Sequence, residues 1–196
     1  MSPNRPTEQK FKTCRRYNTP GDAHSLTFNC FHAQAFLSKD RTRLWLIDAV
    51  SKARERLAFD LWAYVIMPEH CHILIFPRRP TYSISRILEA IKLPVTRRAK
   101  NYLERTSPES LQVMRDKQPD GQVACRFWQR GGGHDRNLFE PQSIHLEIDY
   151  IHNNPVRRGL VAWAEDWPWS TAPWYAGARA VRLTPDVGSI PTLHTT

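Results

Sequence analysis

The order in which two hydrophobic periodicities alternate along this chain is the feature that most constrains its fold. Apolar residues recur at every second position in a β-strand, but every three to four positions on the buried face of a helix. Six segments follow as strand, helix, strand, strand, helix, strand, at residues 24–31, 41–59, 61–67, 71–76, 83–105 and 125–129. This order predicts an α+β, ferredoxin-like split βαβ sandwich, in which an antiparallel sheet carries its helices on one face.

The rest of the chain predicts one further helix and two extended ends. A helical pattern over 141–153 stops near Pro155, which adds a C-terminal helix to the sandwich. Residues 1–21 are polar with three prolines and predict an N-terminal arm, and residues 177–196 predict a flexible tail. In a chain of 196 residues, the remaining part over 22–176 has the size of one domain.

The charge balance predicts a polyanionic partner. The chain has 28 Lys and Arg against 19 Asp and Glu, a formal net charge of +9. A chain this basic usually binds nucleic acid, and an anionic membrane surface is the competing interpretation. No apolar run approaches the roughly 20 residues of a spanning helix, and the polar N-terminus has no secretory signal. The four scattered cysteines form no Cys-x-x-Cys pair, so we expect no zinc ribbon or disulfide framework, and a cytoplasmic protein.

His70 and His72 lie two positions apart where a predicted strand begins. Because side chains alternate in a strand, both imidazoles leave the same face of the sheet. Two converging ring nitrogens can hold one divalent metal ion, and Glu69 is close by. The alternative is that both histidines are partly buried packing residues that bind no metal.

Tyr150 and Asn154 lie four positions apart near the end of the last predicted helix. This spacing places both side chains on one helical face, while His152 points elsewhere. In such an arrangement the phenol of Tyr150 could act as a nucleophile, and the amide oxygen of Asn154 could act as a third metal ligand. The alternative is that Asn153 or Asn154 caps the helix and Tyr150 packs as an ordinary aromatic residue.

Together these groups suit phosphodiester chemistry. A metal held by two imidazoles and one carbonyl can polarise a phosphodiester, which makes it a target for a tyrosine hydroxyl. Attack would leave a phosphotyrosine that a free DNA hydroxyl can reverse, so bond energy is stored without ATP. The sequence agrees with this scheme, because it contains no Gly-x-x-x-x-Gly-Lys-Ser/Thr motif.

Three motifs in this order and spacing resemble the REP-associated tyrosine transposases, relatives of the single-tyrosine HUH transposases of insertion sequences. They are AYVIMPEHCH at 63–72, FWQR at 127–130 and DYIHNNPVRRGLV at 149–161, and the resemblance runs from about Tyr17 to Tyr175. It implies an HUH endonuclease and strand transferase that cuts and rejoins single-stranded or hairpin DNA. It also implies Mg²⁺ or Mn²⁺ as the cofactor, a monomer or a homodimer, and no membrane partner.

The resemblance assigns roles to individual residues. His70 and His72 match the HUH metal pair, and Tyr150 matches the nucleophile, which implies a 5′-phosphotyrosine intermediate. Asn154 matches the third metal ligand, which is a glutamine in the insertion-sequence relatives. The helix that carries Tyr150 is therefore expected to be the catalytic helix.

Basic side chains are the candidates for contacts with backbone phosphates. All of the candidates are arginines or lysines, and they lie in three segments: the N-terminal arm, the helix over 83–105 and the residues after the catalytic helix. They are Arg15, Arg16, Arg97, Arg98, Lys100, Arg157 and Arg158. For the helix residues a solvated surface is the alternative, and Trp128 and Tyr102 could equally stack on bases or pack in the core.

Two other functions share part of this pattern. A rolling-circle replication initiator or relaxase-like nickase has the same histidine pair and tyrosine, but a short chain without a helicase domain disfavours it. A non-catalytic nucleic-acid-binding module of ferredoxin-like fold would use the histidines and the tyrosine structurally. Cleavage of a labelled hairpin oligonucleotide separates this module from both enzymes.

Overall fold

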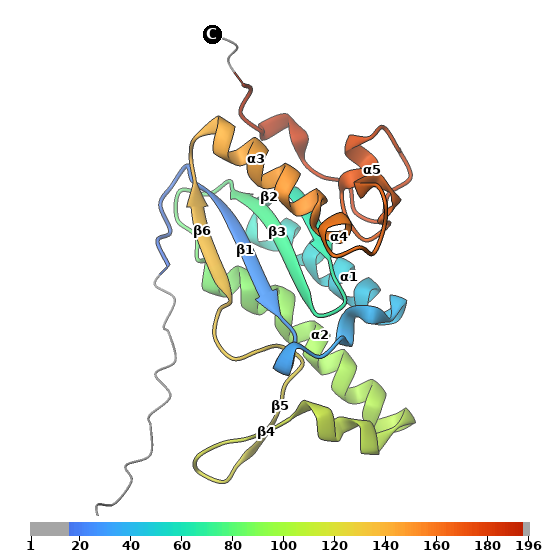
Figure 1. The fold of residues 1–196 in the computed structure, drawn as a ribbon. Helices are drawn as coiled ribbons and strands as arrows, with labels where there is room; N and C mark the ends of the chain where they lie inside the picture. The colour runs from blue at the N-terminus through green and yellow to red at the C-terminus, as the bar shows by residue number, and fades with distance from the viewer. Residues whose placement is uncertain (1–15, 194–196) are drawn as a thin grey trace, which may run out of the picture.

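The computed structural model describes residues 16–193. Its centre is a four-stranded antiparallel sheet in the order β2-β3-β1-β6 (Figure 1). The strands are β1 Ala23–Asn29, β2 Phe59–Ile66, β3 His70–Pro77 and β6 His134–Leu138. Since β1 and β2 both pair antiparallel with β3, they run parallel with one strand between them. This is the split βαβ arrangement that the sequence predicts.

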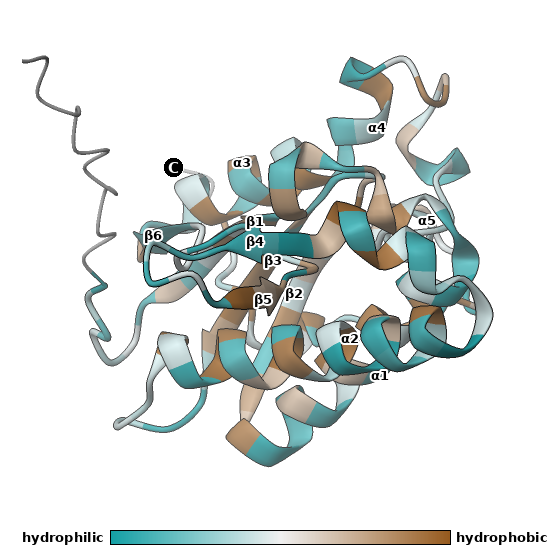
Figure 2. Cartoon of the chain, turned by 90° about the horizontal axis from the view of Figure 1, so that it is seen from below, coloured by the Kyte–Doolittle hydropathy of each residue, from teal (hydrophilic) through white to brown (hydrophobic). Residues whose placement is uncertain are grey.

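Helices cover both faces of the sheet (Figure 2). α1 Asp40–Leu57 and α2 Ile84–Thr106 pack against each other on one face. α3 Pro141–His152 covers the other face and is followed by the single turn α4 Asn154–Arg157. The two crossover helices therefore share a face as predicted, and the C-terminal helix is added opposite them.

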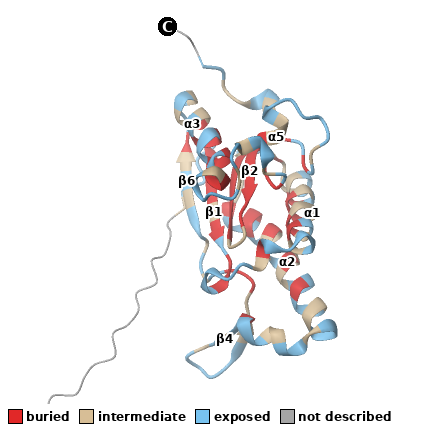
Figure 3. Ribbon diagram, turned by 45° about the vertical axis from the view of Figure 1, so that its right-hand side comes forward, coloured by how far each residue is buried: buried red, intermediate tan, exposed pale blue. Residues whose placement is uncertain are grey.

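Buried residues concentrate on the strands of the sheet and along the helices that cover it (Figure 3). Strand alternation divides this core between the two faces of the sheet. On β3, Ile73 and Ile75 belong to the larger cluster beneath α1 and α2. The residue between them, Leu74, belongs to the smaller cluster beneath α3, together with Ile148. Because both faces are covered, the central strands read as almost continuous apolar runs.

The fourth strand of the sheet is not the segment that the sequence indicated. We predicted it at 125–129, before the Gly131–Gly133 run, but β6 follows that run. β6 is an edge strand with the sequence HDRNL, so it lacks the apolar alternation by which strands are recognised. Phe127 and Trp128 are instead buried from a loop, where Trp128 forms an isolated β-bridge with Cys30.

The segment after α2 contains short elements of its own. A 3-10 helix, Pro108–Met114, leads into a small antiparallel hairpin of β4 Arg115–Lys117 and β5 Val123–Cys125. The other short helices are Phe31–Ala33, Phe36–Ser38, Ala164–Asp166, α5 Ala172–Tyr175 and Val187–Ser189. Within residues 16–193, no helix is long and apolar enough to cross a membrane.

Residues 183–190, after α5, pack against the sheet, which corrects the flexible tail predicted over 177–196 for this part, while residues 194–196 lie outside the described residues. The Asp186 carboxylate accepts a hydrogen bond from the backbone N–H of Leu61, at 2.8 Å. Leu183 is buried in the larger core cluster. This segment thus gives the edge strand β2 a polar contact and adds one apolar side chain to the larger core cluster. Residues 1–15 of the predicted arm lie outside the described residues.

Candidate active site

The alternation of β3 places His70 and His72 on the face of the sheet that α3 covers. Their neighbours Cys71 and Ile73 point the other way, into the core beneath α1 and α2. The two imidazole centroids are 4.8 Å apart with perpendicular rings, and the residues are only 9% and 7% exposed. The predicted common face is therefore present in the structure.

Each imidazole is anchored through its Nδ1 atom. His70 Nδ1 donates to the Glu69 carboxylate at 3.0 Å, because an ionised carboxylate can only accept. His72 Nδ1 shares a hydrogen bond of 2.7 Å with Thr27 Oγ1, from β1. Partners of this kind fix the ring orientation of metal-binding histidines and leave Nε2 to the ligand.

Burial keeps both histidines neutral near pH 7. Burial is the largest cause that lowers the pKa of His72 to about 3, and the nearby Arg157 guanidinium contributes to the same shift. Burial also lowers the pKa of His70, although the Glu69 carboxylate opposes this change. Neutral imidazole is the form that donates a lone pair to a metal ion.

Tyr150 lies on α3 with its ring against His72. The two ring centroids are 5.7 Å apart and the rings are perpendicular. The Arg157 guanidinium carbon lies 4.0 Å from the tyrosine ring centroid, and its Nη2 donates to the Tyr150 carbonyl at 3.2 Å. Tyr150 is nevertheless 43% exposed, so a substrate can reach it.

Asn154 is buried one helical turn after Tyr150. Its Nδ2 donates to the Tyr150 carbonyl at 3.1 Å, which is the carbonyl-capping bond expected if the residue only ends the helix. Asn153 makes the same bond to the Asp149 carbonyl, at 2.9 Å. Because the amide nitrogen of Asn154 is used in this way, its oxygen is the atom left for a ligand.

His152 points away from this site, as its position on the helix predicts. Its Nε2 shares a hydrogen bond of 2.9 Å with Thr171 Oγ1, and its ring contacts Tyr175. Burial lowers its pKa to about 4. His152 is therefore a neutral packing residue of the opposite helical face.

The donor set could hold a hard or borderline divalent metal ion. Among residues 16–193, no three His, Cys, Asp or Glu side chains are grouped closely enough to hold a metal. A site at His70 and His72 would therefore need the Asn154 oxygen or water as further ligands. Two imidazoles with oxygen ligands suit Mn²⁺, and Mg²⁺ when water completes its shell.

Comparison with known proteins assigns this chain to a family. A family model described as "Transposase IS200 like" matches residues 24–131, more than half of the chain. The chain belongs to the IS200-like transposase family. The matched segment of this transposase contains His70 and His72 and ends before α3.

Relatives of this transposase agree with the resemblance drawn from its motifs. A REP-associated tyrosine transposase of Escherichia coli K12 is 25% identical over 158 residues, which cover 80% of each chain. A Haemophilus influenzae protein assigned to the same group is 28% identical over 163 residues, 79% of this chain and 85% of the relative. The solved structure of a REP-associated tyrosine transposase bound to a REP hairpin has a TM-score of 0.64 and 21% identity. It covers 95% of this chain and 100% of its own, and it shows the same fold.

The candidate DNA-binding residues of the transposase lie in separate places. Arg157 contacts Tyr150, and Arg158 pairs with Glu69 beside the histidines. Three candidates lie on α2, behind the sheet as seen from α3, where Arg98 pairs with Asp48 at 2.7 Å. The other two on α2 are the exposed Arg97 and Lys100. Arg16 lines a second cavity on the α2 side, and Arg15 lies outside the described residues.

Several residues near the candidate nucleophile were missed by sequence reasoning. A cavity of about 250 Å³ beside Tyr150 and His72 is also lined by Ser25, Thr27, His134, Arg136 and Glu147. The buried Glu147 carboxylate accepts from Ser25 Oγ at 2.6 Å and pairs with Arg136. One signal was available, because Glu147 lies three positions before Tyr150 and interrupts the apolar face of the helix.

Proposed function

We propose that this IS200-like transposase is a metal-dependent endonuclease and strand transferase that acts on single-stranded or hairpin DNA. Tyr150 is the nucleophile, and cleavage leaves a 5′-phosphotyrosine. The observation that carries the proposal is the contact between an exposed phenol and the ring of His72. That ring belongs to a neutral imidazole pair whose Nδ1 atoms are both anchored.

His70 and His72 would hold Mg²⁺ or Mn²⁺ through Nε2, and Asn154 would add its side-chain oxygen. When bound, the ion polarises the scissile phosphodiester and stabilises the charge that develops on it. Glu69 and Thr27 keep the two rings in place through their bonds to Nδ1. The fixed rings support metal binding because little side-chain entropy remains to be lost.

Cleavage exchanges one phosphodiester for another. The Tyr150 oxygen attacks the phosphorus, and the bond from phosphorus to the 3′ oxygen breaks. The phenol releases its proton to solvent and the 3′ oxygen takes one up, so the step is balanced. A free 3′ hydroxyl can then reverse it without ATP. The Arg157 guanidinium beside Tyr150 supplies positive charge where the attacked phosphate would lie.

Hairpin DNA is the substrate class that the relatives favour. The solved relative is bound to a REP hairpin, and both sequence relatives are named for REP elements. The net charge of +9 and the arginines beside Tyr150 support the same partner. We therefore propose a hairpin with a single-stranded flank that reaches Tyr150.

Cleavage of an end-labelled hairpin oligonucleotide tests this function. We expect cleavage and a covalent protein–DNA band with Mn²⁺ or Mg²⁺, and neither in EDTA. His70→Ala and His72→Ala should each abolish cleavage while the circular dichroism spectrum remains that of the folded protein. Binding without cleavage under every metal condition would support the non-catalytic module instead, and full cleavage in EDTA would exclude the metal.

A further inference from the structure

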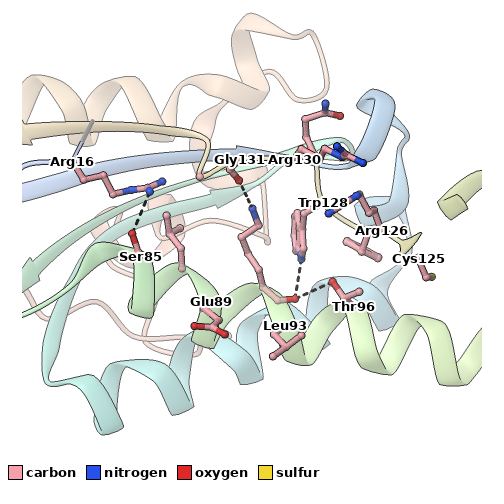
Figure 4. A pocket seen from close by; sticks show the side chains of 15 residues that line it. Arg16, Ser85, Glu89, Leu93, Thr96, Cys125, Arg126, Trp128, Arg130 and Gly131 are labelled. Carbon is pink, nitrogen blue, oxygen red and sulfur yellow. Dashed lines mark hydrogen bonds between the residues drawn. The ribbon is translucent and has the colours of Figure 1, made fainter. Parts of the chain in front are cut away.

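A second cavity lies on the face of the sheet opposite α3, between α2 and the loop from β5 to β6 (Figure 4). Its volume is about 450 Å³. Arg16 lies at one end and Arg126 and Arg130 lie at the other, with Trp128 between them. Four cationic side chains line the cavity against the single carboxylate of Glu89. The cavity is therefore electropositive.

Lys92 lines this cavity without a carboxylate partner among the described residues. Its ammonium group donates to the Gly131 carbonyl at 3.3 Å, a neutral acceptor. Burial, together with the positive charge of Arg16, lowers the pKa of Lys92 to about 8. Lys92 is half-buried. An ammonium group removed from water without a counter-ion is destabilising, and an anion in the cavity would compensate for it.

Arg16 presents a second cation with unused hydrogen-bonding capacity. Its Nη1 donates to Ser85 Oγ at 3.3 Å, and its Nε lies 3.4 Å from the Asp135 carboxylate. Its Nη2 is buried and has no hydrogen-bond partner within residues 16–193. The guanidinium lies against Gly132, where an added Cβ would be 1.4 Å from Nη2. The glycine thus provides the space that Arg16 occupies.

The two arginines at the other end of the cavity already have a counter-ion. Asp116 accepts hydrogen bonds from Nε of both Arg126 and Arg130, the latter at 2.7 Å. These bonds lower the pKa of the Asp116 carboxyl to about 2, so the carboxylate stays ionised. Arg16 has the Asp135 carboxylate near its Nε, so the cation of this cavity that has no carboxylate partner among the described residues is Lys92.

We propose that this cavity is a phosphate-binding site in which the Lys92 ammonium and the Arg16 guanidinium hold one phosphate group. The cationic donors match phosphate oxygens in charge and in hydrogen-bond direction. The inference rests on the proposed function in one respect, namely that DNA is the source of this phosphate. A free phosphate monoester offers the same chemistry and is the other source.

The path of the chain connects this cavity with the tyrosine face. The Gly131–Gly133 run rims the cavity and leads directly into β6. The first residue of β6, His134, pairs with Thr27, whose hydroxyl holds His72. A strand that leaves the cavity around the β6 edge therefore reaches the end of the sheet where the candidate site lies.

Fluorescence anisotropy of a hairpin oligonucleotide with a single-stranded flank tests the site. It is measured in EDTA with the Tyr150→Phe protein, so that no cleavage occurs. Adding Lys92→Met should weaken binding about tenfold, the effect of one charge-assisted contact. Gly132→Ala should weaken it too, because it displaces the guanidinium of Arg16 and leaves its charge. Lys52→Met, at an exposed lysine of α1 paired with Asp48, is the matched control.

A second arm replaces DNA by inorganic phosphate and follows the thermal unfolding temperature. A rise that Lys92→Met abolishes assigns the site to a free phosphate group. No rise, together with the loss of DNA affinity, assigns it to the backbone phosphodiester. Unchanged DNA affinity and phosphate response in both Lys92→Met and Gly132→Ala overturn the proposal. Failure of the proposed function would appear separately, as wild-type protein that forms no covalent adduct.

Discussion

The partners of Nδ1 in His70 and His72 determine which ring nitrogen can meet a ligand. Both partners come from outside the helix that carries Tyr150: Glu69 precedes β3, and Thr27 is the residue of β1 that pairs with His72. The site is therefore assembled on the rigid centre of the sheet. A tyrosine presented by α3 then meets rings that are already oriented.

Removing these Nδ1 partners should weaken metal use. Thr27→Val and Glu69→Gln both preserve side-chain shape. Thr27→Val removes only the hydrogen bond, and Glu69→Gln also removes the carboxylate charge that pairs with Arg158. Groups that orient metal-binding histidines typically contribute about ten- to hundredfold to affinity. We expect half-maximal adduct formation to need about tenfold more Mn²⁺, with Thr106→Val at the end of α2 as the control. An unchanged Mn²⁺ requirement in both variants would show that these bonds do not position the rings.

Lys92 should reduce stability at neutral pH. Its pKa is about 8 in the folded protein and near 10.5 when unfolded, so the unfolded chain binds more protons between these values. The destabilisation is complete below pH 8 and disappears as the pH rises toward 10.5. Lys92→Met should therefore raise the free energy of unfolding by roughly 2 kcal/mol at pH 7 and by little at pH 10.5. Urea unfolding at both pH values measures this, and a destabilised variant at pH 7 would contradict it.

Among the secondary-structure elements, those with strong periodicity were predictable from sequence. The α1, α2 and α3 patterns and the β2–β3 hairpin agree with the structure to within about two residues, since burial imposes their apolar spacing. β6 was not predictable, because an edge strand needs no apolar alternation. The shared face of His70 and His72 followed from strand geometry alone.

The contacts between elements had no local sequence signal. Thr27 and His72 are 45 positions apart, and Ser25 and Glu147 are 122 apart. The expectation that α3 lies close to β3 was based on the family resemblance, because periodicity does not indicate which elements pack together. From the sequence, Lys92 was one of several charged residues of a predicted helix. Its place in a cavity depends on the loop before β6, which is folded against α2 and which the sequence did not predict.

The substitution Gly133→Ala tests how much the close approach of the chain to Thr27, just before β6, contributes to stability. Gly133 has a φ of +74°, and an added Cβ would lie 2.0 Å from the Thr27 carbonyl oxygen. Gly133→Ala should lower the free energy of unfolding by about 2–3 kcal/mol, from backbone strain and this clash. Gly131→Ala, with a φ of +85° and open space around its Cβ, should lose about 1 kcal/mol. Equal losses in chemical denaturation would show that the approach to Thr27 is unimportant.

In the whole molecule, the sheet separates the tyrosine face from the basic α2 face. Tyr150 and Arg157 lie on one side, and the exposed Arg97 and Arg98 lie on the other. A DNA substrate that contacts both must pass around an edge of the sheet. The cavity lined by Arg16 and Lys92 lies on the α2 side, beside the loop that leads into β6.

The salt dependence of DNA binding measures how many of these basic side chains contact DNA phosphates. Each phosphate contact releases counter-ions, so the affinity falls as salt rises. For a single-stranded flank, Arg97→Ala with Arg98→Ala should reduce the slope of log affinity against log salt by about 1.4. The loss should be similar for unrelated sequences. A double variant with wild-type affinity and slope would show that this part of α2 is only solvated surface.

The covalent adduct provides the most decisive measurement. Wild-type protein is incubated with the hairpin oligonucleotide and Mn²⁺, digested with nuclease and protease, and analysed by mass spectrometry. We predict that the peptide containing Tyr150 carries a nucleotide through its 5′ phosphate, and that the released fragment ends in a 3′ hydroxyl. Tyr150→Phe should bind the same DNA and form no adduct. An adduct on another residue, or one that persists in Tyr150→Phe, would contradict the proposed chemistry.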